Sequence, residues 1–254
     1  MNNIQLINNT RNVIKEILEE EGSFDISSIN NLSNDEIELM LEIKPKKKDS
    51  KTLFDIGIGT SLTITLPHKL LSINLHVFYY NISINKSSKT KLNKNIKDKI
   101  YSIFEENIIG EFDLVIMIVD ENISETIFKV ISELNVILQN DIKEKEIPED
   151  LKKEMNDNKC MLEKRHFRNV RIFNLASLSV NLTKNRFVPK HNTIRDEKEI
   201  QDILHKTNCT KVQLPIIKRD DIIARLCMST VGDVIRIDRE SKQGGYSPFY
   251  RLVR

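Results

Sequence analysis

Six acidic-x-lysine tripeptides are the feature of this sequence that most resembles a catalytic motif. A metal-dependent nuclease uses such a tripeptide, with a carboxylate on an adjacent strand, to hold divalent cations beside a phosphate. Charged residues make up 30% of the chain, so six tripeptides are close to the number that chance would give. None lies in a clear strand pattern beside another carboxylate, so the nuclease hypothesis has little support. The tripeptides begin at Glu42, Asp49, Asp141, Asp150, Asp157 and Asp196.

The other reactive side chains do not form a site by their spacing. Neighbouring residues on a helix point about 100° apart, so the carboxylates of Asp220 and Asp221 do not converge and are better explained as charges at a helix N-terminus. The five histidines lack metal-ligand spacing, and Cys160, Cys209 and Cys227 are too far apart for a zinc or disulfide motif. Reduced thiols suit an intracellular compartment. We therefore predict no catalytic residue, no metal and no cofactor.

The composition is that of a folded protein with one large domain or two modest ones. The 254 residues are 39% hydrophobic and carry a net charge of only +2, whereas a protein that binds nucleic acid over its whole surface is far more basic. The charge is uneven, because residues 186–254 contain 14 lysines and arginines against 9 acidic residues, a net +5. No apolar run approaches the roughly 20 residues of a membrane span, so no membrane contact is expected.

The first part of the chain alternates between helix and strand patterns, which predicts an α/β domain. Gly22 is placed to end the first helix, Ser33 and Glu36 have capping-box spacing before the second, and Ser124 is placed to cap another. Helices are expected near residues 11–22, 33–44, 91–106 and 124–138, and strands at 61–67, 72–80, 112–120, 170–175 and 176–182.

The domain boundary is predicted at residue 185, which gives an N-terminal domain of residues 1–184 and a C-terminal domain of residues 185–254. A mixed-charge, apolar-poor stretch at 139–165 is interpreted as an exposed insertion, partly helical or mobile. The C-terminal domain is expected to contain a helix at 195–206, a short helix at 219–228, and a strand pair joined by a turn at Gln243–Tyr246.

The C-terminal segment resembles the assembly domain of the fifth common subunit of eukaryotic nuclear RNA polymerases and of its archaeal counterpart. The shared string is V-P-K-H, then L-P-x-I-x-R-x-D, then G-D-V-I-x-I-x-R-x-S and a final Y-R strand, over about seventy positions. The first part is similar to the family's opening helix and later strands, and the archaeal form lacks that domain, so the chain resembles the eukaryotic form. Two departures are the long 139–165 insertion and the sequence Asn122–Glu125 in place of a Thr-Pro-Ser-Ala-like turn.

The resemblance implies an α/β, restriction-endonuclease-like N-terminal jaw domain and a small α+β C-terminal assembly domain. It implies a non-catalytic subunit of a multi-subunit DNA-directed RNA polymerase, whose active site lies in the two largest subunits. The assembly domain would dock on the largest subunit, among the other polymerase subunits, and the jaw would meet downstream duplex DNA through non-specific phosphate contacts. A stand-alone DNA-binding adaptor and a nuclease-like protein are the alternatives.

The same resemblance supplies the candidate site residues. The arginines of the assembly domain suit bidentate pairing with carboxylates of an acidic partner. The predicted partner interface is Pro189, Lys190, His191, Leu214, Pro215, Arg219, Asp220, Gly232, Asp233, Arg236, Arg239, Tyr250 and Arg251. The predicted DNA-proximal residues are Lys86, Lys89, Lys91, Asn122 and Ser124.

Abundant Asn, Ile and Lys with no Trp indicates an AT-rich genome. Together with the divergent jaw, this favours a version encoded by a large DNA virus, found in the host cytoplasm (the viral factory) and the virion. A divergent protist enzyme in the nucleus is the alternative.

Overall fold

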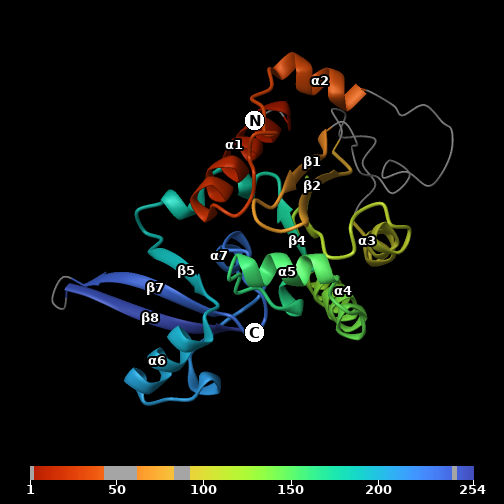
Figure 1. Ribbon diagram of the computed structural model, residues 1–254. Helices are drawn as coiled ribbons and strands as arrows, with labels where there is room; N and C mark the ends of the chain where they lie inside the picture. The colour runs from red at the N-terminus through yellow and green to blue at the C-terminus, as the bar shows by residue number, and fades with distance from the viewer. Residues whose placement is uncertain (1–2, 43–61, 83–91, 242–244) are drawn as a thin grey trace. The chain divides into compact units, whose positions relative to one another are not determined.

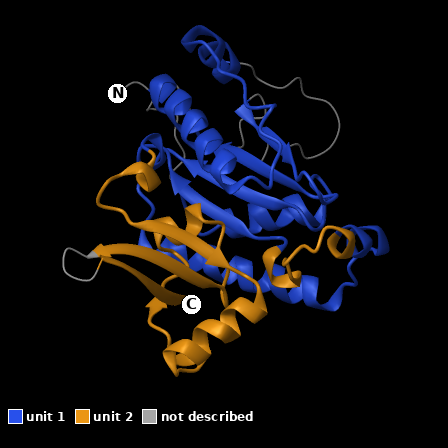
Figure 2. Ribbon diagram, turned by 60° about the vertical axis from the view of Figure 1, so that its left-hand side comes forward, with its two compact units in different colours: residues 1–154, 167–180 blue, residues 155–166, 181–254 orange. Residues whose placement is uncertain are grey.

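The computed structural model describes residues 3–42, 62–82, 92–241 and 245–254 (Figure 1). The chain forms two compact units, each with a sheet of its own (Figure 2). Unit 1 consists of residues 1–154 and 167–180, and unit 2 of residues 155–166 and 181–254. The sequence prediction placed a single boundary at residue 185 and did not foresee that residues 155–166 belong to the second unit.

Unit 1 is built on a four-stranded sheet with the order β1-β2-β3-β4. Strand β1 (Ile64–Pro67) is antiparallel to β2 (Asn74–Tyr80), whereas β3 (Leu114–Val119) and β4 (Val170–Asn174) continue the sheet in parallel. All of β3 is buried, as the continuous apolar run predicted. Strand β2 was expected to be half-buried, but six of its seven residues are buried because it lies inside the sheet and under helices.

Helices cover both faces of this sheet (Figure 1). Helices α3 (Ile96–Glu105) and α4 (Glu125–Glu144) pack on the face that carries Phe78, Met117 and Ile172. Helix α1 (Asn3–Glu21) lies on the other face, where Thr10 donates a 3.4 Å hydrogen bond to the carbonyl of Leu175. None of the described helices is both long and apolar enough to cross a bilayer.

Three predicted helix boundaries of unit 1 are confirmed. Gly22 follows α1 with a φ of 83°, a left-handed conformation that favours glycine. Helix α2 (Asn34–Glu42) begins with a capping box, because the Glu36 amide donates to the Ser33 hydroxyl (3.2 Å) and the Ser33 amide donates to the Glu36 carboxylate (2.7 Å). The Ser124 hydroxyl accepts the Ile127 amide at the start of α4.

One local prediction is confirmed in part and another is wrong. The stretch 139–165 is partly helical, as predicted, because its first residues continue α4 and it also forms α5 (Glu149–Asp157). It is not simply an exposed insertion, because α4 buries Ile142 and α5 buries Leu151. The expected strand at 176–182 is instead a pair of 3-10 turns, η4 (Ser177–Ser179) and η5 (Leu182–Lys184), of which η5 begins with the Asn181 side chain accepting the Thr183 amide. Serine and asparagine favour such local bonds over a strand ladder. The strand and helix signals at 43–61 and 83–91 lie outside the described residues.

Unit 2 has a second four-stranded sheet, with the order β5-β7-β8-β6. Strands β5 (Lys190–Ile194), β7 (Val234–Ser241) and β8 (Gly245–Val253) are antiparallel neighbours, and the short β6 (Ile216–Ile217) pairs in parallel with the end of β8. Helix α6 (Glu197–Thr207) packs on the sheet face that carries Val234 and Leu252. Helix α7 (Ile222–Leu226) packs Ala224 on the opposite face, beside Ile235 and Val253.

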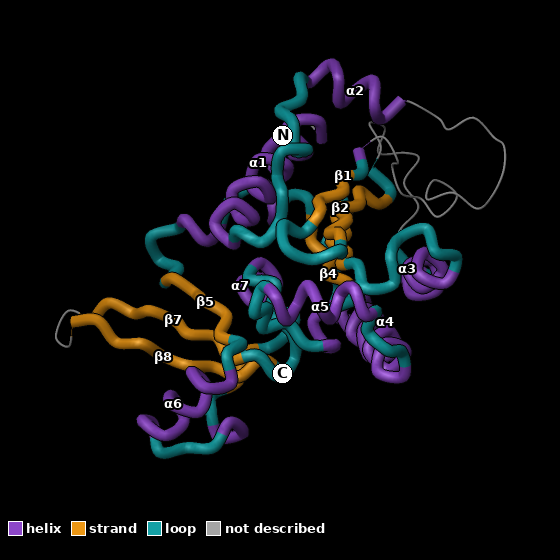
Figure 3. Tube along the Cα trace, in the orientation of Figure 1, coloured by secondary structure: helices purple, strands orange, loops and turns teal. Residues whose placement is uncertain are grey.

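The β7–β8 hairpin is longer than the rest of this sheet (Figure 3). Strand β5 pairs with β7 only as far as Asp238, and β6 pairs only with Leu252 and Val253. Residues Arg239–Ser241 and Gly245–Ser247 therefore pair only with each other. Of the predicted turn at Gln243–Tyr246, Gln243 and Gly244 lie outside the described residues, and Gly245 has a left-handed φ of 67°.

A buried His–Asp pair holds the start of β3 in unit 1. His76 Nε2 lies 2.8 Å from Asp113 Oδ2, and the same carboxylate accepts the backbone amides of Asn74 (2.7 Å) and Gly110 (2.8 Å). Burial alone would raise the pKa of Asp113, but these hydrogen bonds lower it. A Cβ on Gly110 would lie 2.7 Å from the carboxylate. Glycine is therefore required there by close approach.

The substitution Gly110→Ala should lower the free energy of unfolding of unit 1 by about 1–3 kcal/mol, because the carboxylate has no room to move without losing its partners. Hydrogen exchange of the β2 and β3 amides would measure this. Lys94→Ala, an exposed side chain before α3, is the control and should change exchange little. Equal effects of the two substitutions would contradict the packing argument.

Candidate protein-binding surface

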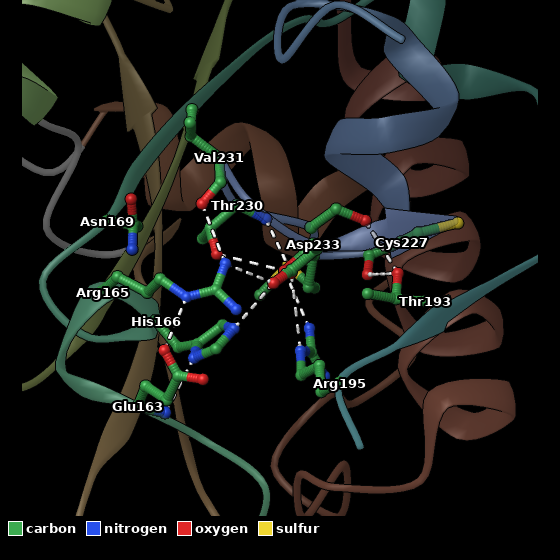
Figure 4. Close-up of polar contacts among 12 residues, drawn as sticks. Glu163, Arg165, His166, Asn169, Thr193, Arg195, Cys227, Thr230, Val231 and Asp233 are labelled. Carbon is green, nitrogen blue, oxygen red and sulfur yellow. Dashed lines mark hydrogen bonds and ion pairs between the residues drawn. The ribbon is translucent and has the colours of Figure 1, made fainter. Parts of the chain in front are cut away.

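Asp233 is the centre of a buried polar cluster in unit 2 (Figure 4). Its Oδ1 atom lies 2.7 Å from Arg165 Nη1 and 3.0 Å from His166 Nε2. Its Oδ2 atom accepts the Thr230 amide (3.0 Å) and forms a longer ion pair with Arg195 Nε (3.6 Å). The carboxylate therefore joins residues from three separate parts of the chain.

The hydrogen bonds of His166 define its tautomer. Nδ1 accepts the backbone amide of Glu163 at 2.8 Å, so Nε2 must carry the proton that is donated to Asp233. A neutral imidazole satisfies both bonds, and the side chain is buried. The short segment Lys164–His166 is a 3-10 turn that places Arg165 and His166 on the same carboxylate.

The cluster lowers the pKa of Asp233. Burial alone would raise the pKa, but the hydrogen bond from His166, the Thr230 amide and the Arg195 charge outweigh it and bring the pKa to about 2. An aspartate whose folded pKa is below its unfolded pKa stabilises the fold above the unfolded value, near 3.9, and loses that effect as the pH falls toward 2. The difference corresponds to about 2–3 kcal/mol at neutral pH.

Gly232 is a structural residue of the same turn. Its φ is 96°, and a Cβ there would lie 2.8 Å from Arg165 Nη1. Its amide donates to the Val253 carbonyl (3.0 Å), while the Arg165 guanidinium donates to the Val231 carbonyl (2.8 Å). The tight Gly232–Asp233 turn expected from the sequence is therefore present, and its glycine is required by backbone geometry.

A second set of contacts holds the end of the chain against β6 and the start of α7. The Arg219 amide donates to the Arg254 carbonyl (2.7 Å), and the Leu252 amide donates to the Pro215 carbonyl (2.8 Å). The Asp221 carboxylate caps α7 by accepting the Ile223 amide, so Asp221 has the helix-terminal role expected from the sequence. The two aspartates of this turn are not a catalytic pair.

The guanidinium groups of Arg219 and Arg225 lie in a partly desolvated environment. Burial lowers the pKa of both, and the Asp220 charge opposes this effect without reversing it. Arg225 Nε also donates to the Asp220 carbonyl at 3.1 Å. Arg219 and Asp220, both predicted interface residues, therefore lie in one charged turn beside Arg225. The sequence alone did not predict this arrangement.

The β7–β8 hairpin carries arginines on both faces of the sheet. On one face, Arg236 Nε pairs with Asp238 Oδ1 at 2.8 Å. On the other face, the guanidinium carbons of Arg239 and Arg251 lie 4.5 Å and 5.4 Å from the centroid of the Phe249 ring. Both arrangements follow from the two-residue period of a strand.

The predicted interface residues therefore differ in accessibility. Leu214 and Asp233 are buried inside unit 2, so their side chains support the surface of the isolated chain from within. The remaining predicted residues are half-buried or exposed. Sequence reasoning missed Arg165 and His166, because no local pattern links them to Asp233. It also missed Val212 and Ile216, which are 68% and 48% exposed on either side of Leu214–Pro215.

The described DNA-proximal candidates lie at the start of α4. Asn122 and Ser124 are exposed, but Glu125 occupies the first turn of the helix and Asp120 and Glu121 precede them. Lys86, Lys89 and Lys91 lie outside the described residues.

The acidic-x-lysine tripeptides have helical or capping positions where they are described. Asp141 and Asp150 lie in α4 and α5, and Asp196 caps α6 by accepting the Lys198 amide. Within the described ranges, no group of three or more His, Cys, Asp and Glu side chains is arranged to hold a metal ion.

Unit 2 is a small α+β domain in which buried charges hold a sheet that carries several arginines. Comparison with known proteins identifies a domain of the same class. Residues 180–253 match the family model described as RNA polymerase Rpb5, C-terminal domain. The DNA-directed RNA polymerase subunit Rpo5 of Methanosarcina acetivorans is 44% identical over 66 residues, which cover 26% of this chain and 83% of that protein. Rpo5 of Archaeoglobus fulgidus is 42% identical over 72 residues, covering 28% and 93%.

A eukaryotic relative is also similar. The rpabc1 subunit of DNA-directed RNA polymerases I, II and III from Dictyostelium discoideum is 36% identical over 80 residues, which cover 32% of this chain and 40% of that protein. The chain therefore belongs to the Rpo5/Rpb5 family of DNA-directed RNA polymerase subunits.

The substitution Asp233→Asn should destabilise unit 2 at pH 7 by roughly 3 kcal/mol, because Arg165 and Arg195 lose their buried counter-charge. It should also abolish the loss of stability that the parent shows as the pH falls from about 4 to about 2. Hydrogen exchange of β7 amides against pH would measure both effects. Asp202→Asn, on the exposed side of α6, is the matched control, and an identical acid response in the Asp233→Asn variant would contradict the assignment.

Proposed function

We propose that this chain is a non-catalytic subunit of a multi-subunit DNA-directed RNA polymerase and that unit 2 docks on the largest subunit. The observation that carries the proposal is the match of residues 180–253 to the Rpb5 C-terminal domain, together with identities of 42–44% to archaeal Rpo5 subunits over most of their length. The matched region makes up most of these proteins, which are named as polymerase subunits, and this supports the same role here.

The accessible residues of unit 2 support docking. Val212, Pro215 and Ile216 expose apolar side chains within a stretch of five residues. Arg219 in the turn that follows and Arg225 in α7 are partly desolvated. The cores of protein interfaces are depleted in charged residues other than arginine. They contain apolar side chains that are exposed in the free protein and become buried on binding. This segment is the proposed centre of the contact with the largest subunit.

Unit 1 is proposed to be the jaw domain, with its DNA contacts limited to phosphates. Its α/β sheet, the exposed start of α4 and the lysines near residue 89 support this role. Because three carboxylates surround Asn122 and Ser124, phosphate binding should depend mainly on Lys86, Lys89 and Lys91.

The proposed setting is a polymerase encoded by a large DNA virus, located in the host cytoplasm and the virion. Abundant Asn, Ile and Lys without Trp, and the departures of residues 122–125 and 139–165 from the family pattern, support a divergent gene. A cellular, nuclear enzyme is the other outcome, and the composition of a polymerase purified through this chain distinguishes the two.

The pair of substitutions Val212→Asp and Ile216→Asp should lower recovery of the largest polymerase subunit with the tagged full chain by about tenfold or more, because docking would bury two new carboxylates. Quantitative mass spectrometry of the captured complex is the measurement. Leu39→Asp, at a residue of α2 that is 61% exposed, is the matched control in unit 1. If the parent chain recovers no polymerase subunit, the proposed function is wrong and the chain is a stand-alone protein.

Changing Lys86, Lys89 and Lys91 together to Gln should weaken binding of the full chain to duplex DNA equally for unrelated sequences. It should also reduce the slope of log affinity against log salt by roughly 1 for each phosphate that is no longer bound. Fluorescence anisotropy across a salt series would show this. The triple change of Lys129, Lys143 and Lys153 to Gln removes the same charge from exposed positions of α4 and α5, and an equal effect would refute a local DNA contact.

A further inference from the structure

We infer that the outer face of the β7–β8 hairpin binds an acidic protein segment, with Arg239 and Arg251 pairing its carboxylates on either side of Phe249. This inference rests on the docking role proposed above and adds a specific surface and the chemistry of its ligand.

Arg239, Phe249 and Arg251 lie on one face of the hairpin. Phe249 is opposite Ile237 in the ladder, Arg251 is opposite Ile235, and Arg239 is opposite Ser247. Side chains two residues apart on a strand share a face, so these three side chains project in the same direction as Ile235 and Ile237. Helix α7 packs against the inner end of this face, whereas Phe249 and Arg251 remain half-buried and Arg239 is exposed.

The two guanidinium groups are close to each other. Their central carbons lie 4.5 Å and 5.4 Å from the same ring centroid, so they are separated by no more than the sum of those distances, about 10 Å. Contact with the ring orders both groups, because the aromatic quadrupole attracts a cation. The ring does not neutralise them, and two like charges so close together favour an anionic ligand.

The acidic side chains of β7 do not supply that anion. Asp238 and Glu240 alternate with Arg239 and therefore lie on the opposite face, where Asp238 pairs with Arg236. Among the described residues, neither Arg239 nor Arg251 has an ion pair with a carboxylate, and the side-chain hydrogen bond of Arg251 goes to the Ile216 carbonyl at 3.4 Å. The two faces of one hairpin thus differ: one has an internal ion pair and the other has two cations.

Carboxylates fit this surface better than nucleic acid does. A single-stranded nucleic acid stacks bases on open aromatic rings, but here two guanidiniums already lie over the Phe249 ring. A guanidinium held in place presents a rigid two-donor fork to a carboxylate. Two such forks within about 10 Å match two carboxylates of one extended segment, which lie roughly 7 Å apart when they are two positions apart on one face.

Recognition through these side chains is favoured over addition of a strand. Pro248 lies in β8 opposite Asp238, and beyond it β6 covers β8 only at Leu252 and Val253. Proline has no amide hydrogen to donate to an added strand, so the edge near Phe249 is a poor template for pairing.

The test uses the full-length chain and two fluorescent probes, a hexaglutamate peptide and a single-stranded hexathymidylate. The parent should bind hexaglutamate, and Arg239→Ala with Arg251→Ala should weaken that binding about tenfold or more. Changing both arginines to Lys keeps the charge but removes the fork, so it should recover only part of the affinity. Arg186→Ala removes an exposed guanidinium that lies 4.5 Å from the Phe187 ring centroid, outside the hairpin; it is the matched control and should leave the affinity unchanged.

Three results would overturn the inference: hexaglutamate binding that survives the double Ala change, equal losses with Arg186→Ala, or tighter binding of hexathymidylate that depends on the same two arginines. Unchanged exchange of β7 amides in the double variant shows that the hairpin is folded. Capture of polymerase subunits by the same variant separates the two proposals. If the subunits are recovered but hexaglutamate binding never depended on the arginines, the surface assignment fails and the docking role stands.

Discussion

The arrangement of unit 2 depends on one buried carboxylate. The Asp233 carboxylate holds the turn before β7 by accepting the backbone amide of Thr230. It also binds Arg165, His166 and Arg195, which come from distant parts of the chain. A buried charge is tolerated only when it is fully paired, so each of these groups is fixed in turn. Strand β7, which carries Arg239, begins immediately after this turn, and β8, which carries Phe249 and Arg251, pairs along it.

Under the proposed function, some arginines of unit 2 stabilise its fold and others are available to bind a partner. Arg165 and Arg195 are used inside the unit, and Arg236 pairs with Asp238 on its own strand. Among the described residues, Arg239 and Arg251 have ring contacts with Phe249, Arg251 has a hydrogen bond to a carbonyl, and neither has an ion pair with a carboxylate, which leaves their charge available to a partner. A non-catalytic polymerase subunit needs such a division, because its contribution is the geometry and affinity of contacts and not a reaction.

Much of the fold could be predicted from local signals, and the parts that could not depend on distant contacts. The capping box at Ser33, the Gly22 terminus and the buried β3 run are local patterns, and the structure has all three. The motif around Gly232 and Asp233 identified the family, yet it gave no sign that Asp233 is paired with residues near position 165. Residues 155–166 looked like a solvated insertion because their apolar content is low. Within this stretch, Arg165 and His166 contact the distant Asp233, and contacts of that kind have no sequence period.

The central claim is that unit 2 is the part of this chain that contacts the largest polymerase subunit. Cross-linking mass spectrometry of the purified assembly tests it most directly, because Lys190 and Lys218 are exposed in unit 2 and Lys129 and Lys153 are exposed in unit 1. The account predicts that Lys190 and Lys218 cross-link mainly to the largest subunit. An assembly in which only the unit 1 lysines reach that subunit, and the unit 2 lysines do not, would contradict it.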